Sequence, residues 1–131
     1  MISSTSNKCL FVYVGQPDMN FALAGKRNYS MKREPQIGFA YLSAVLRQQG
    51  VDSEILDFTI HPHTKESLNA YIAESPPVFV GFYAAAAMKE RLLGFLRSVR
   101  QKFPELKILV GGPDMFDSED YLTAGADVFC L

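Results

Sequence analysis

Five short β-like segments alternate with four helix-like segments along this chain, and the alternation is the feature that most restricts its fold. The β-like segments are residues 8–14, 52–58, 78–83, 107–110 and 127–131. Strands that alternate with helices favour a parallel sheet whose two faces are covered by helices. The order therefore predicts an open, five-stranded α/β fold.

The helix-like segments carry apolar residues at helical spacing. They are residues 36–49, 64–74, 88–103 and 118–122. The first follows Pro35 and stops at Gly50, which are typical start and stop residues. Its wide apolar face predicts close packing on the sheet.

The strand order is predicted to be 2-1-3-4-5, the Rossmann or flavodoxin-like arrangement. The first, third and fourth strands are the most continuously apolar, so we expect them in the centre. Glu54 and the acidic ends of the second strand suit an edge. Ligands of such sheets bind outside the carboxyl ends of the strands, which directs attention to loops 15–35, 59–63, 84–87 and 111–117.

Charge and hydropathy exclude several function classes. The net charge of −1 lacks the basic excess of a duplex-binding protein. No apolar run approaches the roughly 18–20 residues that span a bilayer, and the N-terminus has no signal-peptide core. We expect a cytoplasmic protein that binds neither nucleic acid nor membrane. The 131 residues fit one domain, 1–131, and no sixth element follows the last strand, so we expect an N-terminal fragment of a longer enzyme.

No residue pattern in the chain predicts catalysis or a metal site. The two cysteines, Cys9 and Cys130, lie in apolar runs and are expected to be buried. No Cys/His cluster and no nucleophile–base pair is present, so the predicted metal and catalytic sets are both empty. We expect no turnover by this chain alone.

The loops also argue against other ligands of this architecture. The first strand is followed by GQPDMN, which is neither a G-x-G-x-x-G turn, nor a P-loop, nor a Ser/Thr-rich flavin loop. The acidic pair, aspartate and lysine of a phosphoacceptor receiver are missing from the corresponding strand ends. A nucleotide or flavin binder is therefore disfavoured.

Small residues follow the third and fourth strands. They are the four alanines at 84–87 and the Gly-Gly-Pro at 111–113. Each alone is explained by a helix start or a turn, but together they leave room for a bulky apolar group near the backbone.

Several segments resemble the N-terminal cobalamin-binding domain of B12-dependent radical SAM enzymes. The run PQIGFAYLSAVL at 35–46 is similar to that family's P-x-x-G-L-A-Y-L-A-A-x-L, and Gly50 with ILD at 55–57 is similar to the G and V-x-x-x-D that follow. VGF at 80–82, FPELKILVGGP at 103–113 and Asp127-Val128 resemble its later segments. The family often has Ser or Thr after the third strand, where this chain has Tyr83 and alanines.

The resemblance implies a cobalamin-binding module. The partner would be the radical SAM domain of a parent methyltransferase or related enzyme, whose 4Fe-4S cluster and S-adenosylmethionine lie outside this chain. No histidine occurs between Gly15 and Pro35, so the resemblance implies cobalamin held without a protein histidine ligand. His61 and His63 follow the second strand, which is the wrong loop for cobalt.

The resemblance and the small residues together define the predicted cofactor-binding set. It comprises Gln16, Pro17, Tyr83, Ala84, Ala85, Gly111, Gly112 and Pro113. We expect Gly112→Leu to fill this pocket. The alternative is an α/β interaction or regulatory domain without a cofactor, in which these loops are ordinary turns.

Overall fold

The computed structural model describes residues 7–15, 36–114 and 118–130. Its strands are β1 (Lys8–Tyr13), β2 (Asp52–Asp57), β3 (Phe79–Tyr83), β4 (Lys107–Gly111) and β5 (Val128–Cys130). Its helices are α2 (Ile37–Gln48), α3 (Lys65–Glu74), α4 (Lys89–Lys102) and α5 (Ser118–Ala124), with a 3-10 turn at Ala86–Met88 before α4.

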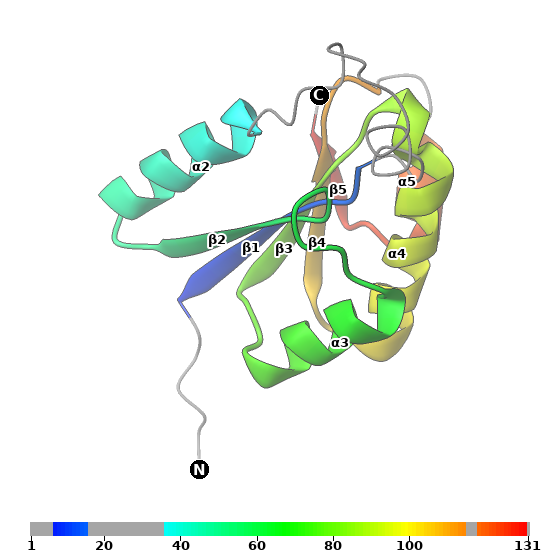
Figure 1. Ribbon diagram of the computed structural model, residues 1–131, viewed down its shortest axis with the longest axis horizontal. Helices are drawn as coiled ribbons and strands as arrows, with labels where there is room; N and C mark the ends of the chain where they lie inside the picture. Colours follow the sequence, from blue (N-terminus) through cyan, green and yellow to red (C-terminus); the bar gives the residue numbers. More distant parts are fainter. Residues whose placement is uncertain (1–6, 16–35, 115–117, 131) are drawn as a thin grey trace.

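The five strands form one parallel sheet in the order β2-β1-β3-β4-β5. This confirms the predicted fold, with β1, β3 and β4 in the interior and β2 at an edge. Figure 1 shows α2 on one face of the sheet and α3, α4 and α5 on the other.

Local sequence explains several element ends. Thr64 caps α3: its side chain accepts from the Ser67 N–H at 3.0 Å, and Ser67 Oγ accepts from the Thr64 N–H at 2.8 Å. Gly50 follows α2 with a φ of +78°, a conformation that glycine adopts readily. These ends fix where each helix begins or stops relative to the sheet.

The main hydrophobic core lies on the face covered by α3, α4 and α5. Alternate residues of the central strands point into it, among them Leu10, Val12 and Val80. The helices contribute fully buried side chains from their inner faces: Leu68, Ile72, Leu92, Leu96, Val99 and Tyr121. This face therefore carries most of the apolar burial that stabilises the described residues.

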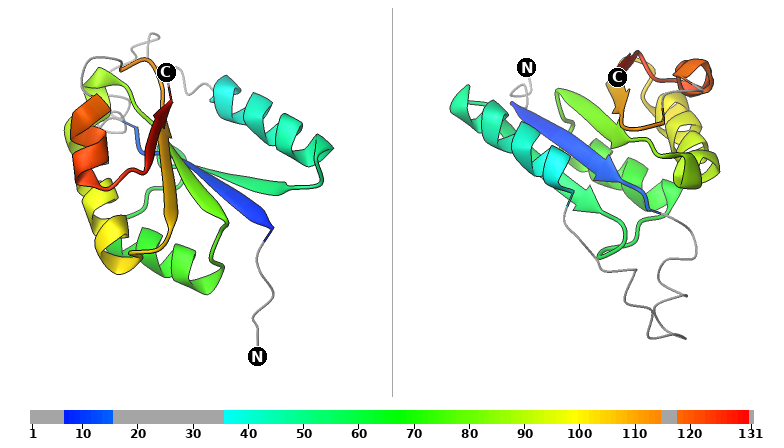
Figure 2. Two further views of the ribbon diagram at one scale, coloured as in Figure 1. Left: turned by 180° about the vertical axis from the view of Figure 1, so that it is seen from behind. Right: turned by 90° about the horizontal axis from the view of Figure 1, so that it is seen from above.

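The other face is only partly covered, which corrects one expectation. Helix α2 lies over β1 and β2 (Figure 2), and Phe39 is its one buried side chain among those described. Tyr41 is 71% exposed and Leu42 is 47% exposed. The expected close packing of the whole apolar face of α2 is wrong, because this helix stands beside β3 and β4 rather than on them.

Candidate functional site

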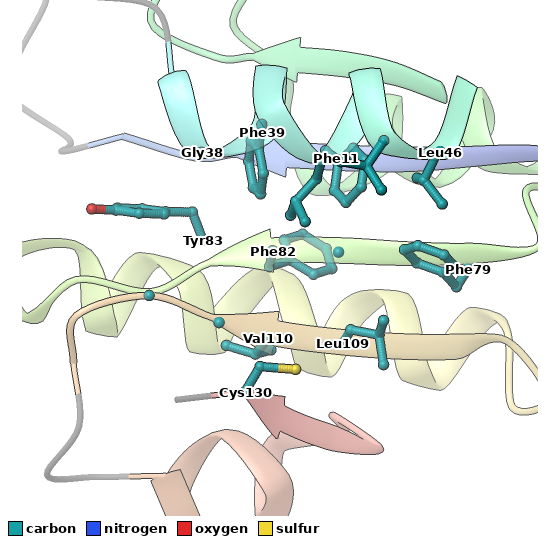
Figure 3. A pocket seen from close by; sticks show the side chains of 15 residues that line it. Phe11, Gly38, Phe39, Leu46, Phe79, Phe82, Tyr83, Leu109, Val110 and Cys130 are labelled. Carbon is teal, nitrogen blue, oxygen red and sulfur yellow. The ribbon is translucent and has the colours of Figure 1, made fainter. Parts of the chain in front are cut away.

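A cavity of about 570 Å³ lies between α2 and the uncovered part of the sheet. Figure 3 shows side chains from α2 on one side of it and from β3, β4 and β5 on the other. The lining residues are Phe11, Gly38, Phe39, Leu42, Val45, Leu46, Phe79, Gly81, Phe82, Tyr83, Leu109, Val110, Gly111, Gly112 and Cys130. Its volume lies within the usual range of small-molecule sites, roughly 300–1,000 Å³.

Two glycines of the central strands lie in the wall of this cavity. Phe11, Gly81 and Leu109 are paired across β1, β3 and β4 and so share one face. A Cβ at Gly81 would lie 3.0 Å from Cδ1 of Phe11, because the phenyl ring lies over the bare backbone there. In the next row Gly111 pairs with Tyr83, and a Cβ there would lie 3.4 Å from the Cys130 carbonyl oxygen. β3 and β4 thus each have a glycine in the cavity wall, and the Phe11 ring lies over the one at Gly81.

Aromatic rings form the wall beneath α2. The rings of Phe11 and Phe39 stack with centroids 5.0 Å apart, and Phe79 meets Phe11 edge-on at 5.8 Å. Tyr83 meets Phe39 edge-on at 6.2 Å. Contacts of this kind fix the ring planes and present flat apolar surfaces to a ligand.

A pair of tyrosines lies at the carboxyl end of this wall. Tyr13 and Tyr83 have ring centroids 5.5 Å apart. Burial, with smaller contributions from Tyr83 and Asp57, raises the pKa of Tyr13. The raised pKa keeps the Tyr13 hydroxyl protonated, and so able to donate a hydrogen bond, at neutral pH.

The loops after β3 and β4 are tied together by backbone hydrogen bonds. The Ala84 N–H donates to the Gly111 carbonyl at 2.7 Å, and the Asp114 N–H donates to the Ala84 carbonyl at 3.3 Å. Gly112 has a φ of +143°, and a Cβ there would overlap the Ala84 carbonyl oxygen. A larger residue at Gly112 would clash with the Ala84 backbone and displace this loop. Gly112→Leu is therefore a poor test of whether a ligand occupies the cavity.

Asp114 anchors the loop that follows Gly112, a role that the sequence analysis missed. Its side chain is buried, with 6% of the residue exposed, and it accepts a hydrogen bond of 2.5 Å from the Tyr121 hydroxyl on α5. The bond holds the loop after Gly112 against that helix. An acidic residue directly after Gly-Gly-Pro was the available signal, but its burial depends on a tyrosine from a later element.

The structure brings together part of the predicted cofactor-binding set. Tyr83, Gly111 and Gly112 line the cavity. Ala84 is completely buried in the main core, and Ala85 and Pro113 are not among the described residues that line the cavity. Gln16 and Pro17 lie outside the described residues.

The contribution of α2 was also missed. Gly38, Phe39, Leu42, Val45 and Leu46 line the cavity from this helix. A Cβ at Gly38 would meet no atom within 4 Å, so this glycine opens space without being forced by the backbone. A glycine inside an amphipathic helix was the signal that this helix faces an open space instead of a packed core.

The cysteines and histidines add no metal site. Cys9 is buried as expected, but Cys130 is exposed at the cavity, because β5 is an edge strand on the uncovered face. His63 packs against Phe58 and Tyr71, and its Nδ1 is 3.0 Å from Ser67 Oγ. Within residues 7–15, 36–114 and 118–130, no group of three or more His, Cys, Asp or Glu side chains could hold a metal ion.

No helix in the described part of the chain has both the length and the hydropathy needed to cross a bilayer. No curated protein matches this sequence. Among solved structures, a CheY-like protein (tadZ) from Pseudomonas aeruginosa PAO1 is similar, with a TM-score of 0.64 and 12% sequence identity. The match covers 92% of this chain and 84% of that one, and it shows the shared fold.

A protein-family model identifies the family of the chain, which the structural similarity alone does not. The model of the B12 binding domain matches residues 30–131. That span includes helix α2, the Gly111-Gly112 turn and all the strands except β1, so it covers nearly the whole lining of the cavity. The chain belongs to the B12-binding domain family.

Proposed function

We propose that this chain binds cobalamin and that the cavity beneath α2 holds the nucleotide base of the cofactor. The observation that carries the proposal is the position of the cavity, which reaches the carboxyl ends of β3 and β4 at Tyr83, Gly111 and Gly112. Ligands of open α/β sheets bind at such ends. Family membership names the ligand class, and the cavity supplies a place for its apolar part.

The residues present fit such a group. A flat aromatic base needs apolar walls, and the residues that line this cavity are almost all apolar. The aromatic wall of Phe11, Phe39 and Tyr83 offers ring contacts. When bound, cobalamin supplies cobalt chemistry such as methyl-group transfer, while the protein supplies binding and orientation.

Neither histidine of the chain lines this cavity. His61 is exposed, and His63 is held in the loop before α3 by its contacts with Phe58, Tyr71 and Ser67. That loop leads to the face of the sheet opposite α2. The proposal therefore has cobalamin held by its tail and side groups, with no histidine of this chain on the cobalt.

The wider context of the proposal is a B12-dependent radical SAM enzyme. In that context the chain is the cobalamin module of a cytoplasmic methyltransferase or related enzyme. A radical SAM domain would be its partner and would hold the 4Fe-4S cluster and S-adenosylmethionine. The sequence segments at 35–46 and 103–113 support this reading.

Titration with hydroxocobalamin tests the binding. The chain is gel-filtered after loading, and bound corrinoid is read from its visible spectrum. Gly38→Leu places a side chain into the open space and should weaken binding at least tenfold. Ala40→Leu is the matched control, because Ala40 is exposed on the same helix and does not line the cavity.

The controls separate this proposal from its rival. If Gly38→Leu binds hydroxocobalamin as the wild type does, or if both variants lose affinity equally, the ligand does not bind in this cavity. Failure of the wild-type chain to bind hydroxocobalamin would instead favour a cofactor-free interaction domain. The observation that favours this second function is exposed apolar surface on α2 outside the cavity, where Ile37 is 77% exposed and Tyr41 is 71% exposed.

A further inference from the structure

We infer that the cavity beneath α2 selects among cobamides by their lower base, accepting an apolar aromatic base such as dimethylbenzimidazole and disfavouring a purine. Cobamides are corrinoids of the cobalamin type that differ in this base. The inference rests on the proposed cobalamin binding and adds to it a preference set by the chemistry of the lining.

The lining offers almost no hydrogen-bonding side chain. Of the 15 residues that line the described cavity, Tyr83 and Cys130 alone carry a polar side-chain atom. Figure 3 shows the Tyr83 hydroxyl at the carboxyl end of β3, pointing away from Phe82 and Leu109. A thiol is a weak hydrogen-bond donor and acceptor. The side chains that line the cavity therefore offer a bound base almost only carbon atoms.

The paired backbone of β3 and β4 is also occupied. β3 pairs with β4 from Phe79–Lys107 to Tyr83–Gly111, so their backbone groups are engaged in the ladder. The Gly111 carbonyl accepts from the Ala84 N–H at 2.7 Å. The buried side-chain polar atoms without a partner in the described part are on Ser43, Ser53 and Asn69, none of which lines the cavity.

The shape of the lining favours a flat ring with apolar substituents. Phe11 stacks on Phe39 and meets Phe79 edge-on along one wall. Branched aliphatic side chains stand around them: Leu42, Val45, Leu46 and Leu109. Such walls give dispersion contacts to ring faces and methyl groups alike.

A purine in the same place would lose hydrogen bonds. Adenine carries two more ring nitrogens and an exocyclic amine than dimethylbenzimidazole, and each bonds to water outside the site. Inside the cavity these atoms would meet carbon, and a polar group buried without a partner weakens binding substantially. We expect adeninylcobamide to bind about tenfold or more weakly than cobalamin.

Three corrinoids test the inference on the full chain by visible-spectrum titration: hydroxocobalamin, adeninylcobamide, and cobinamide, which lacks the base. Cobalamin should bind best, and each of the other two should bind about tenfold or more weakly. Leu42→Gln should narrow the gap between adeninylcobamide and cobalamin, because Leu42 lines the cavity yet is half exposed and tolerates a polar replacement. Ala44→Gln, on an exposed position outside the lining, should leave the gap unchanged.

The possible failures are distinguishable. Equal binding of cobalamin and adeninylcobamide would overturn the selectivity while leaving cobalamin binding in place. Cobinamide binding as tightly as cobalamin would also overturn it, because the base would then lie outside the cavity. No binding of any of the three would overturn the proposed function and the selectivity with it.

Discussion

Gly112 joins β4 to the next loop with a φ of +143°. A side chain at this residue would be strained, and its Cβ would overlap the Ala84 carbonyl oxygen. We expect Gly112→Ala to lower the free energy of unfolding by about 1–3 kcal/mol. Chemical denaturation followed by far-UV circular dichroism measures the change.

Gly38→Ala is the matched comparison for Gly112→Ala. Gly38 lies within α2, where an added Cβ meets nothing within 4 Å, and alanine is the better helix former. Its free energy of unfolding should equal or exceed that of the wild type. Equal destabilisation by the two alanines would show that backbone conformation does not account for Gly112.

Asp127, which lies just before β5, makes the free energy of unfolding depend on pH. Its Oδ2 accepts from the Ile108 N–H and from Arg100 Nη2, both at 2.8 Å. The Ile108 hydrogen bond, followed by the Arg100 contacts, holds the pKa of this carboxyl below its usual value of 3.8. Because the folded-state pKa is the lower one, the contribution is complete above 3.8 and is lost as the pH falls through the folded-state value.

Asp127→Ala should therefore be less stable than the wild type at pH 7, and the difference should shrink progressively below about pH 4. Urea unfolding at a series of pH values measures it. Asp127→Asn keeps an acceptor for Ile108 without the charge and should show a smaller loss at pH 7. A deficit for Asp127→Ala that stays constant from pH 7 to pH 3 would contradict the assignment.

At the scale of elements, a buried hydrogen bond between Tyr121 of α5 and Asp114 holds the loop after β4. Tyr121→Phe leaves the buried Asp114 carboxylate without the hydroxyl that donates to it at 2.5 Å. An acceptor buried without its donor costs about 1–3 kcal/mol, and we expect destabilisation of that size in thermal or urea unfolding. Tyr71→Phe on α3 is the control, since Tyr71 is only partly buried. A loss no larger than that of the control would show that the bond adds nothing to stability.

The strands could be predicted from the sequence because their apolar runs are local features. KCLFVY, FVGFY and KILVG form the three central strands, and β2 with its Glu54 lies at an edge. The packing of α2 could not be predicted in the same way. Its apolar stripe is typical of a helix packed on a sheet, but the helix lies beside β3 and β4, a placement that depends on contacts between distant segments.

The candidate site was predictable only where a turn motif marks it. Gly111 and Gly112 stand out in the sequence, and they line the cavity. Ala84 looked equivalent, yet it faces the main core, because successive residues of an extended strand end point to opposite faces. Asp114 and the lining residues of α2 depend on contacts between distant segments, which a single sequence does not reveal.

For the molecule as a whole, the two faces of the sheet are unequally packed. The face of α3, α4 and α5 buries a continuous core in which Leu92, Leu96 and Val99 of α4 are fully enclosed. The opposite face has α2 with one buried side chain, Phe39, among those described, and a cavity of about 570 Å³ beside it. Local opening is easiest where few apolar contacts are buried.

Hydrogen exchange should show this difference directly. The backbone amides of α2 should exchange faster than those of α4, because α2 can detach while the main core stays closed. Hydroxocobalamin should slow exchange in α2 much more than in α4, since a ligand stabilises the state to which it binds and this cavity adjoins α2 alone of the two. Mass spectrometry of peptides from residues 37–48 and 89–102, with and without ligand, measures both effects. Equal exchange in the two helices of the free chain would contradict the unequal packing of the faces, whereas ligand protection confined to α4 would place cobalamin on the opposite face of the sheet.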